Sequence, residues 1–166
     1  MSFLKIKNIL ATIAVASTIA ACDNGSDCNI NNVSYNRIQL YSTTDGGGNT
    51  QTGKYSYPNA LTVKMVINGT DSIVINNLTG ASELQLPVSY THECDTVVFE
   101  YEEGSTDTLY VGHSNIPYFI STDCGMAMYH KLTTLQYTGN MIDSAAINDP
   151  TINFSWHENI KLYIAE

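Results

Sequence analysis

The sequence predicts an all-β protein, folded as an antiparallel β-sandwich of immunoglobulin-like architecture. Apolar and polar residues alternate with a period of two in most segments after residue 33, which is typical of strands with one buried face. Turn-forming residues recur about every ten residues, as in sandwiches built from short strands. Beyond residue 21, no window of twelve or more residues has the period that a helix requires. An open barrel is the alternative architecture.

The chain divides into three expected segments. It has 166 residues, of which 43% are hydrophobic, and this suits a single domain with a buried core. We expect a signal peptide over 1–21, a flexible tether over 22–32 and the β-sandwich domain over 33–166.

The predicted strands follow one another along the domain. Every second residue from Leu61 to Ile67 is apolar, and the Asn-Gly pair at 68–69 is typical of a tight hairpin. The Gly-rich stretch 45–53 is predicted to be a loop, "EEGSTD" (102–107) to be a second hairpin loop, and Pro117 to mark a bulge or strand end. The predicted strands are 33–41, 60–67, 72–76, 82–88, 95–102, 106–112, 126–132, 151–156 and 160–166.

The N-terminal segment indicates export. Lys5 and Lys7 precede an apolar run over 9–19, which is too short to cross a bilayer core of about 30 Å as a helix. The following "IAAC" (19–22) resembles the lipobox of bacterial lipoproteins. This resemblance implies that Cys22 becomes the first mature residue and carries acyl chains, palmitate among them, which together hold a protein stably on a membrane. The alternative is an ordinary signal peptide cut after Ala21, with Cys22 free to form a disulfide.

The acidic, Ser/Asn/Gly-rich residues after Cys22 bear on location. With Asp23 and Asp27 they resemble the export signals of Bacteroidota-type surface lipoproteins. We therefore expect an outer-membrane protein, lipid-anchored on the cell surface or on the periplasmic face. The simpler interpretation of the same residues is a polar tether, which applies in either place.

The charge excludes one class of partner. The formal net charge is -9, and removal of the leader with its two lysines would make the mature chain more acidic still. Nucleic-acid binding depends on basic residues that neutralise phosphates, so we expect no nucleic-acid partner. The expected partners are the membrane, through the anchor, and an unidentified protein or glycan.

The cysteines predict one disulfide in an oxidising compartment. If Cys22 is lipidated, Cys28, Cys94 and Cys124 remain, and three pairings are open. Loop-closure entropy separates the pairings by only about 1 kcal/mol, which does not decide between them.

Six short motifs together resemble a family of small Bacteroidota lipoproteins of unknown function. They are "LTV" (61–63), "DSIVI" (71–75), "DTLYV" (107–111), "DCGM" (123–126), "NMID" (140–143) and "KLYI" (161–164). The resemblance spans nearly the whole mature chain and implies no known activity. It does imply a disulfide between Cys28 and Cys124, with Cys94 as a buried thiol. Pairing of Cys94 with Cys124 is the alternative.

A further resemblance concerns modification. Asp, then Ser or Thr, then an aliphatic or similar residue resembles the O-glycosylation motif of secreted Bacteroidota proteins. It occurs four times, with the acceptor hydroxyls on Ser72, Thr96, Thr108 and Ser144. The structural alternative is that Asp followed by Ser or Thr and a β-branched residue begins many strands.

No catalytic residue, metal ligand or cofactor is predicted. The four histidines are far apart, and none has the spacing of a known zinc motif. The stretch "HECD" (92–95) could form half of a metal site, and a metalloenzyme would bring two or more of His92, Cys94 and Asp95 together with a distant histidine. A solvated strand entry is the simpler interpretation.

We therefore expect a lipid-anchored envelope protein whose domain is a non-catalytic accessory or interaction module. The alternative function is a glycan-binding surface module that uses about three coplanar exposed aromatic rings, since such rings suit the faces of sugars. Trp156, Tyr55 and Tyr57 are the candidate ligand contacts, and the loop "YSYPN" (55–59) is the best candidate for an exposed cluster.

Overall fold

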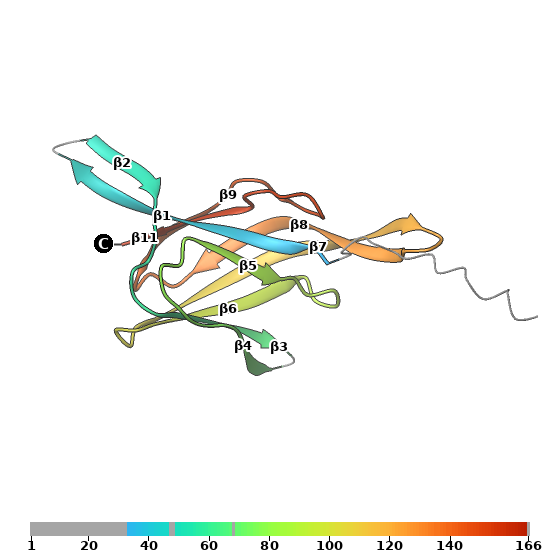
Figure 1. Cartoon of the computed structure of the whole chain (residues 1–166), viewed down its shortest axis with the longest axis horizontal. Coiled ribbons are helices and arrows are strands. Elements are labelled where there is room, and N and C mark those ends of the chain that lie inside the picture. The colour runs from blue at the N-terminus through green and yellow to red at the C-terminus, as the bar shows by residue number, and fades with distance from the viewer. Residues whose placement is uncertain (1–32, 47–48, 68, 166) are drawn as a thin grey trace, which may run out of the picture.

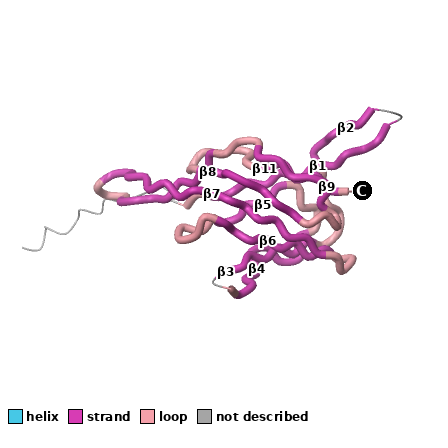
Figure 2. Tube along the Cα trace, turned by 180° about the vertical axis from the view of Figure 1, so that it is seen from behind, coloured by secondary structure: helices cyan, strands magenta, loops and turns pink. Residues whose placement is uncertain are grey.

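The computed structural model describes residues 33–46, 49–67 and 69–165. Within these residues the chain forms eleven strands and no helix, arranged in two sheets that share one core (Figures 1 and 2). The predicted all-β sandwich is therefore confirmed. No helix of the described residues has the length and apolar character needed to span a membrane. The predicted signal peptide (1–21) and tether (22–32) lie outside the described residues.

Sheet one holds the first and last strands of the domain side by side. Its order is β2-β1-β11-β9, and β5 also pairs with β1. β1 and β11 run parallel, with Ile38 opposite Ile160, whereas the other pairs are antiparallel. The sheet is thus mixed rather than purely antiparallel. The strands are β1 (Tyr35–Gly46), β2 (Asn49–Lys54), β5 (Glu83–Pro87), β9 (Ile142–Ile147) and β11 (Ile160–Ile164).

Sheet two is antiparallel throughout, in the order β10-β8-β7-β6-β3-β4. β7 and β8 form a long hairpin whose far end, where Ser121 pairs with Gly125, projects beyond the body of the sandwich (Figures 1 and 2). The strands are β3 (Leu61–Ile67), β4 (Thr70–Leu78), β6 (Cys94–Tyr101), β7 (Thr106–Ser121), β8 (Gly125–Tyr137) and β10 (Thr151–Ile152).

The core forms where the alternating apolar residues of the two sheets meet. Ile38 and Leu40 of β1 are buried against Val63 of β3 and Phe99 of β6 in one continuous cluster. Successive strand residues point to opposite faces, so the period of two in the sequence becomes one buried face per strand. Each fully buried aliphatic or aromatic side chain contributes about 1.5–3 kcal/mol relative to exposure.

Both predicted hairpins are confirmed. Ile67 of β3 pairs with Thr70 of β4, and Gly69 between them has a φ of 75°, which residues other than glycine rarely adopt. β6 and β7 are joined at 102–105, where the N–H of Tyr101 donates to the carbonyl of Ser105.

Four features of the strand prediction are wrong. The strand predicted over 151–156 is limited to Thr151–Ile152 (β10). Residues 45–53 are not a loop but include the β1–β2 hairpin, whose polar residues pair through backbone hydrogen bonds without an apolar stripe. β9 was not predicted, because in this edge strand only Ile142 is fully buried. β7 does not end near 112 but runs on to Ser121. β6 pairs with β7 only as far as Gly112, so Pro117 lies where one edge of β7 has no partner strand.

Candidate functional site

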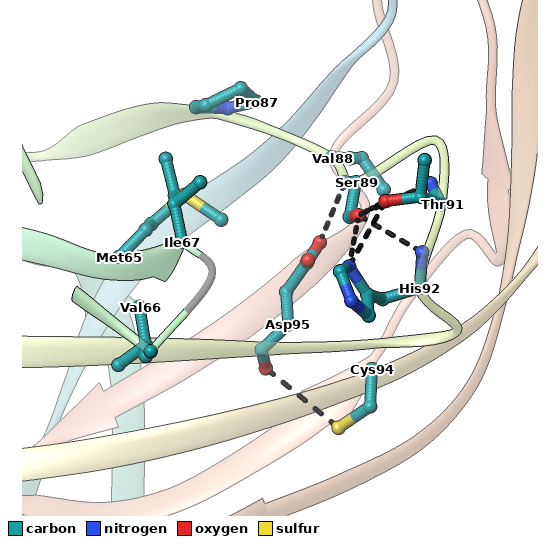
Figure 3. A pocket seen from close by; sticks show the side chains of 11 residues that line it. Met65, Val66, Ile67, Pro87, Val88, Ser89, Thr91, His92, Cys94 and Asp95 are labelled. Carbon is teal, nitrogen blue, oxygen red and sulfur yellow. Dashed lines mark hydrogen bonds between the residues drawn. The ribbon is translucent and has the colours of Figure 1, made fainter. Parts of the chain in front are cut away.

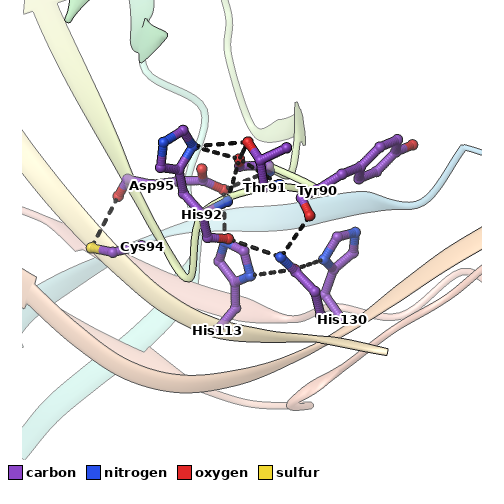
Figure 4. Close-up of polar contacts among 9 residues, drawn as sticks. Tyr90, Thr91, His92, Cys94, Asp95, His113 and His130 are labelled. Atoms are coloured by element: carbon purple, nitrogen blue, oxygen red, sulfur yellow. Dashed lines mark hydrogen bonds and ion pairs between the residues drawn. The ribbon is translucent and has the colours of Figure 1, made fainter. Parts of the chain in front are cut away.

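A group of buried polar side chains lies where β6, β7 and β8 meet the loop over 88–93 (Figure 4). Asp95 begins the inward alternation of β6, His113 follows a bulge in β7, and His130 belongs to β8. Asn115, two residues after His113, sits opposite His130 in the β7–β8 ladder. Two histidines and a carboxylate that are distant in sequence therefore share one site.

Asn115 organises this histidine cluster. Its Nδ2 donates to the carbonyls of Tyr90 (3.1 Å) and His92 (2.9 Å), which fixes the orientation of the amide. Its Oδ1 then accepts from Nδ1 of His113 (3.0 Å) and from Nδ1 of His130 (2.7 Å). Both imidazoles are thereby assigned the tautomer that carries a proton on Nδ1.

The two histidines differ in environment. Nε2 of His113 lies 3.2 Å from Oδ2 of Asp95, so the pair is ionic when His113 is protonated. His130 is 1% exposed, and its Nε2 has no hydrogen-bond partner among the described residues. Burial, followed by the nearby charge of His113, lowers the pKa of His130 to about 4. His130 is thus a neutral, buried side chain stacked on the Tyr90 ring at 5.7 Å.

A cavity of about 310 Å³ opens beside this cluster (Figure 3). In it, Nδ1 of His92 contacts Oγ of Ser89 (3.2 Å) and Oγ1 of Thr91 (3.1 Å). A hydroxyl beside a histidine is the start of a nucleophilic site, but Asp95 does not orient His92. Its carboxylate instead accepts from the backbone N–H of Ser89 at 3.2 Å. The arrangement holds the loop in place and does not form a Ser-His-Asp relay. The cavity is lined by Met65, Val66, Ile67, Gly69, Pro87, Val88, Ser89, Thr91, His92, Cys94 and Asp95.

The side chains of His92, Cys94 and Asp95 in "HECD" do not converge on one site. Asp95 meets the distant His113, whereas His92 and Cys94 are exposed, and Cys94 Sγ lies 4.0 Å from the carbonyl oxygen of Asp95. Across residues 33–46, 49–67 and 69–165, no three His, Cys, Asp and Glu side chains are grouped so as to hold a metal ion.

The predictions for the cysteines have different outcomes. Cys22 and Cys28 lie outside the described residues, so lipidation and the Cys28–Cys124 pairing stay predictions. Cys94 has a free thiol, so the alternative Cys94–Cys124 bridge is absent. The expectation that Cys94 is buried is wrong, because the buried positions of β6 are Asp95, Val97, Phe99 and Tyr101. This alternation, visible in the sequence, places Cys94 on the opposite face.

The four O-glycosylation motifs occupy the same place in four strands. Ser72, Thr96, Thr108 and Ser144 are half-buried, each being the third residue of its strand. Two of the preceding carboxylates, on Asp95 and Asp107, are buried and hydrogen-bonded. The other two motifs lie in β4 and β9, which are edge strands with exposed aspartates.

The predicted exposed cluster at 55–59 is wrong. Tyr57 is 2% exposed, because its ring packs edge-on against Tyr101 and its hydroxyl donates to Glu103. Burial and this hydrogen bond raise the pKa of Tyr57 to about 12. Tyr55 packs against the core, and only Trp156 of the three candidates is largely exposed, at 57%.

Sequence reasoning missed two partly exposed rings, those of Tyr41 and Tyr163. They lie opposite each other in β1 and β11. The alternation contained the information, because each tyrosine follows a buried leucine, Leu40 or Leu162, and so points to the outer face of sheet one.

Comparison with known proteins gives one match. The model of a protein family described as a family of unknown function (DUF6452) matches residues 60–164. This range runs from β3 to β11 and therefore includes all of sheet two and the histidine cluster. No curated protein and no solved structure matches the chain.

Proposed function

We propose that this chain, which belongs to the DUF6452 family of unknown function, is a lipid-anchored protein of the outer membrane in a Bacteroidota-type envelope. Its sandwich serves there as a non-catalytic interaction domain. The observation that carries the proposal is the lipobox-like "IAAC" at 19–22, placed after a basic and apolar leader and shortly before Val33, the first described residue.

The organisation of the polar groups supports a binding role over a catalytic one. Asn115 and Asp95 use their side chains to hold the loop over 88–93 against β6, β7 and β8. The charged groups of the site are thereby committed to structure rather than presented to a substrate.

A disulfide between Cys28 and Cys124 forms part of the proposal. Oγ of Ser34 donates to the carbonyl of Met128 at 2.7 Å, which fixes the start of the domain beside β8. An extended chain advances about 3.3 Å per residue, so Cys28, six residues before Ser34, can reach Cys124, four residues before Met128. The free thiol of Cys94 is consistent with this pairing. Such a bridge would join the tether to the projecting hairpin.

O-glycosylation is proposed for Ser72 and Ser144. Both acceptors belong to edge strands, and the aspartates before them are exposed. At Thr96 and Thr108, by contrast, the motif carboxylate is buried and already hydrogen-bonded.

Intact-mass analysis of the protein from its native host, with and without reduction, tests the proposal. We expect acyl chains on a chain that begins at Cys22, and a gain of two hydrogens on reduction of one disulfide. Cys22→Ser should remove the acyl mass and release the protein from the membrane fraction, while Cys94→Ser, the matched control, should change neither. An unlipidated mature chain in the wild type would refute the anchor and with it the location.

A further inference from the structure

The outer face of sheet one carries an ordered row of side chains on its two central strands. Arg37, Gln39 and Tyr41 of β1 alternate with Ile38 and Leu40, and so point away from the core. The side chain of Gln39 is nevertheless covered, at 5% exposure, and its Nε2 donates to the carbonyl of Ser82 at 2.7 Å. On β11, Lys161 pairs with Gln39 and Tyr163 pairs with Tyr41. Directly paired residues share a face of the sheet. These side chains therefore form one continuous surface.

One end of this surface is a pair of tyrosine rings. The centroids of Tyr41 and Tyr163 are 5.5 Å apart, with the planes inclined by 35°. Nζ of Lys161 lies 5.6 Å from the centroid of the Tyr41 ring, and the Tyr41 hydroxyl donates to Oε1 of Glu158 at 3.0 Å. Lys161 is also 3.8 Å from Oε1 of Glu158. The Tyr41 ring is thus held by Lys161 over its face and by Glu158 at its hydroxyl, and both rings remain partly exposed.

The other end is the indole of Trp156. Its Nε1 donates to Oε1 of Glu83 at 3.3 Å, and the same oxygen lies 3.6 Å from Nη1 of Arg37. Glu83 pairs with Gln39 in the ladder between β5 and β1. The Tyr41 row is two residues further along β1, which corresponds to about 7 Å. Two separate aromatic stations therefore lie on one face, with hydrogen-bonding side chains between them.

We propose that this outer face, with Trp156 at one station and Tyr41 and Tyr163 at the other, binds a neutral oligosaccharide. The proposal rests on the interaction role given above, because it names the ligand of that domain. Aromatic rings supply apolar area for the C–H face of a sugar and leave their polar atoms free to orient it. Because the two stations belong to rows about 7 Å apart along β1, we expect a ligand of more than one pyranose unit.

The charges on the face favour a neutral ligand. Four of its charged side chains are arranged in two pairs, Arg37 with Glu83 and Lys161 with Glu158. The exposed Lys54, opposite Tyr41 in the β1–β2 ladder, adds one positive charge. The surface is therefore close to neutral, while the chain as a whole has a formal charge of -9. The long-range field of the protein therefore disfavours polyanions, and the surface itself is complementary to hydroxyl groups.

The single tryptophan of the chain makes the test site-specific. Because Trp156 is the only tryptophan, a change in indole fluorescence during a titration reports this surface alone. The probes are maltohexaose, cellohexaose, xylohexaose and mannohexaose, added to the full mature chain, with calorimetry in parallel. At least one probe should give a saturable shift and a matching heat, and heparin, a polyanion, should give neither.

Variants separate stacking from folding. Tyr163→Ala and Trp156→Ala should each weaken binding by about tenfold or more by calorimetry, as expected when one stacking contact is lost. Tyr163→Phe keeps the ring and should bind as the wild type does. Tyr137→Ala is the matched control, because Tyr137 is 40% exposed at the end of β8 in sheet two.

The outcomes distinguish this proposal from the anchor. Absence of binding by all four hexasaccharides, or an equal loss of affinity in Tyr137→Ala, overturns the oligosaccharide site whatever the mass of the protein is. Binding by a chain whose Cys22 proves to be unlipidated supports the site and refutes only the anchor. Circular dichroism of Tyr163→Ala and Tyr163→Phe shows whether the variants are folded.

Discussion

Asp107 links the two sheets through its carboxylate, and its removal should destabilise the fold strongly. The residue is 1% exposed at the start of β7 in sheet two. Its Oδ1 accepts from Oγ1 of Thr138 and from the N–H of Asn140, both at 2.8 Å. Its Oδ2 accepts from the N–H of Met141 (2.7 Å) and of Ile142 (2.9 Å), where β9 of sheet one begins.

The expected cost follows from these four hydrogen bonds. In Asp107→Ala the N–H groups of Met141 and Ile142 lose their acceptor, and Ile142 is 2% exposed. An unpaired buried donor costs about 1–3 kcal/mol, and a hydrogen bond to a charged group contributes about 1.5–3 kcal/mol. The contributions overlap, so the free energy of unfolding should fall by about 3–5 kcal/mol, which is at the upper end for a single substitution.

Urea unfolding followed by circular dichroism measures this cost. Asp143→Ala is the matched control, because Asp143 is an exposed aspartate of the same kind of motif on β9 and should change stability by less than about 0.5 kcal/mol. Equal stability of Asp107→Ala and Asp143→Ala would show that the Asp107 carboxylate does not stabilise the contact between the two sheets, and would refute this prediction.

Three further predictions concern buried or special positions. The folded state holds the pKa of His130 at about 4, below the unfolded value of about 6.5. As the pH is lowered, the unfolded chain therefore takes up the proton first. The free energy of unfolding should fall by at most about 3 kcal/mol from pH 6.5 to pH 4. His130→Gln should remove this part of the pH dependence in urea unfolding at both pH values, and an unchanged slope would contradict it. Cys94, free and exposed, should react with a thiol reagent in the folded protein, and a native protein that reacts only in denaturant would argue against that placement. Gly112→Ala places a Cβ in steric conflict with Oγ1 of Thr134, whereas a Cβ on Gly53 would have nothing within 4 Å. Gly112→Ala should therefore cost about 1–3 kcal/mol and Gly53→Ala far less, and a similar loss in the two variants would refute the close approach.

The alternation of apolar and polar residues in the sequence predicts most of the fold. β3, β6 and β11 follow the predicted periodicity, because one face of each strand packs into the shared core. β2 could not be found in the same way, since its pairing with β1 depends on backbone hydrogen bonds that polar residues form equally well. The extension of β7 past Pro117 was also hidden. A proline usually ends a ladder, and the sequence does not show that β6 stops at the level of Gly112.

The candidate sites were less predictable for a topological reason. Asp95 stood out in the sequence, but its partner His113 meets it only through the register between β6 and β7 and the bulge after Gly112. Tyr57 was expected to be exposed because Pro58 suggested a loop. A bridge to Ala81 instead draws its ring into the core.

The parallel pairing of β1 with β11 sets the order in which the domain can fold. The N–H of Arg37 donates to Oδ1 of Asn159, and the N–H of Asn159 donates to the carbonyl of Arg37, across 122 residues of chain. Closure of so long a loop is slow, because its entropy is lost before the contacts form. Sheet two can assemble from neighbouring hairpins, but sheet one waits for the last strand to be synthesised. A chain cut before Ile160 would therefore leave one edge of β1 without its partner strand, and an unpaired strand edge is prone to aggregation.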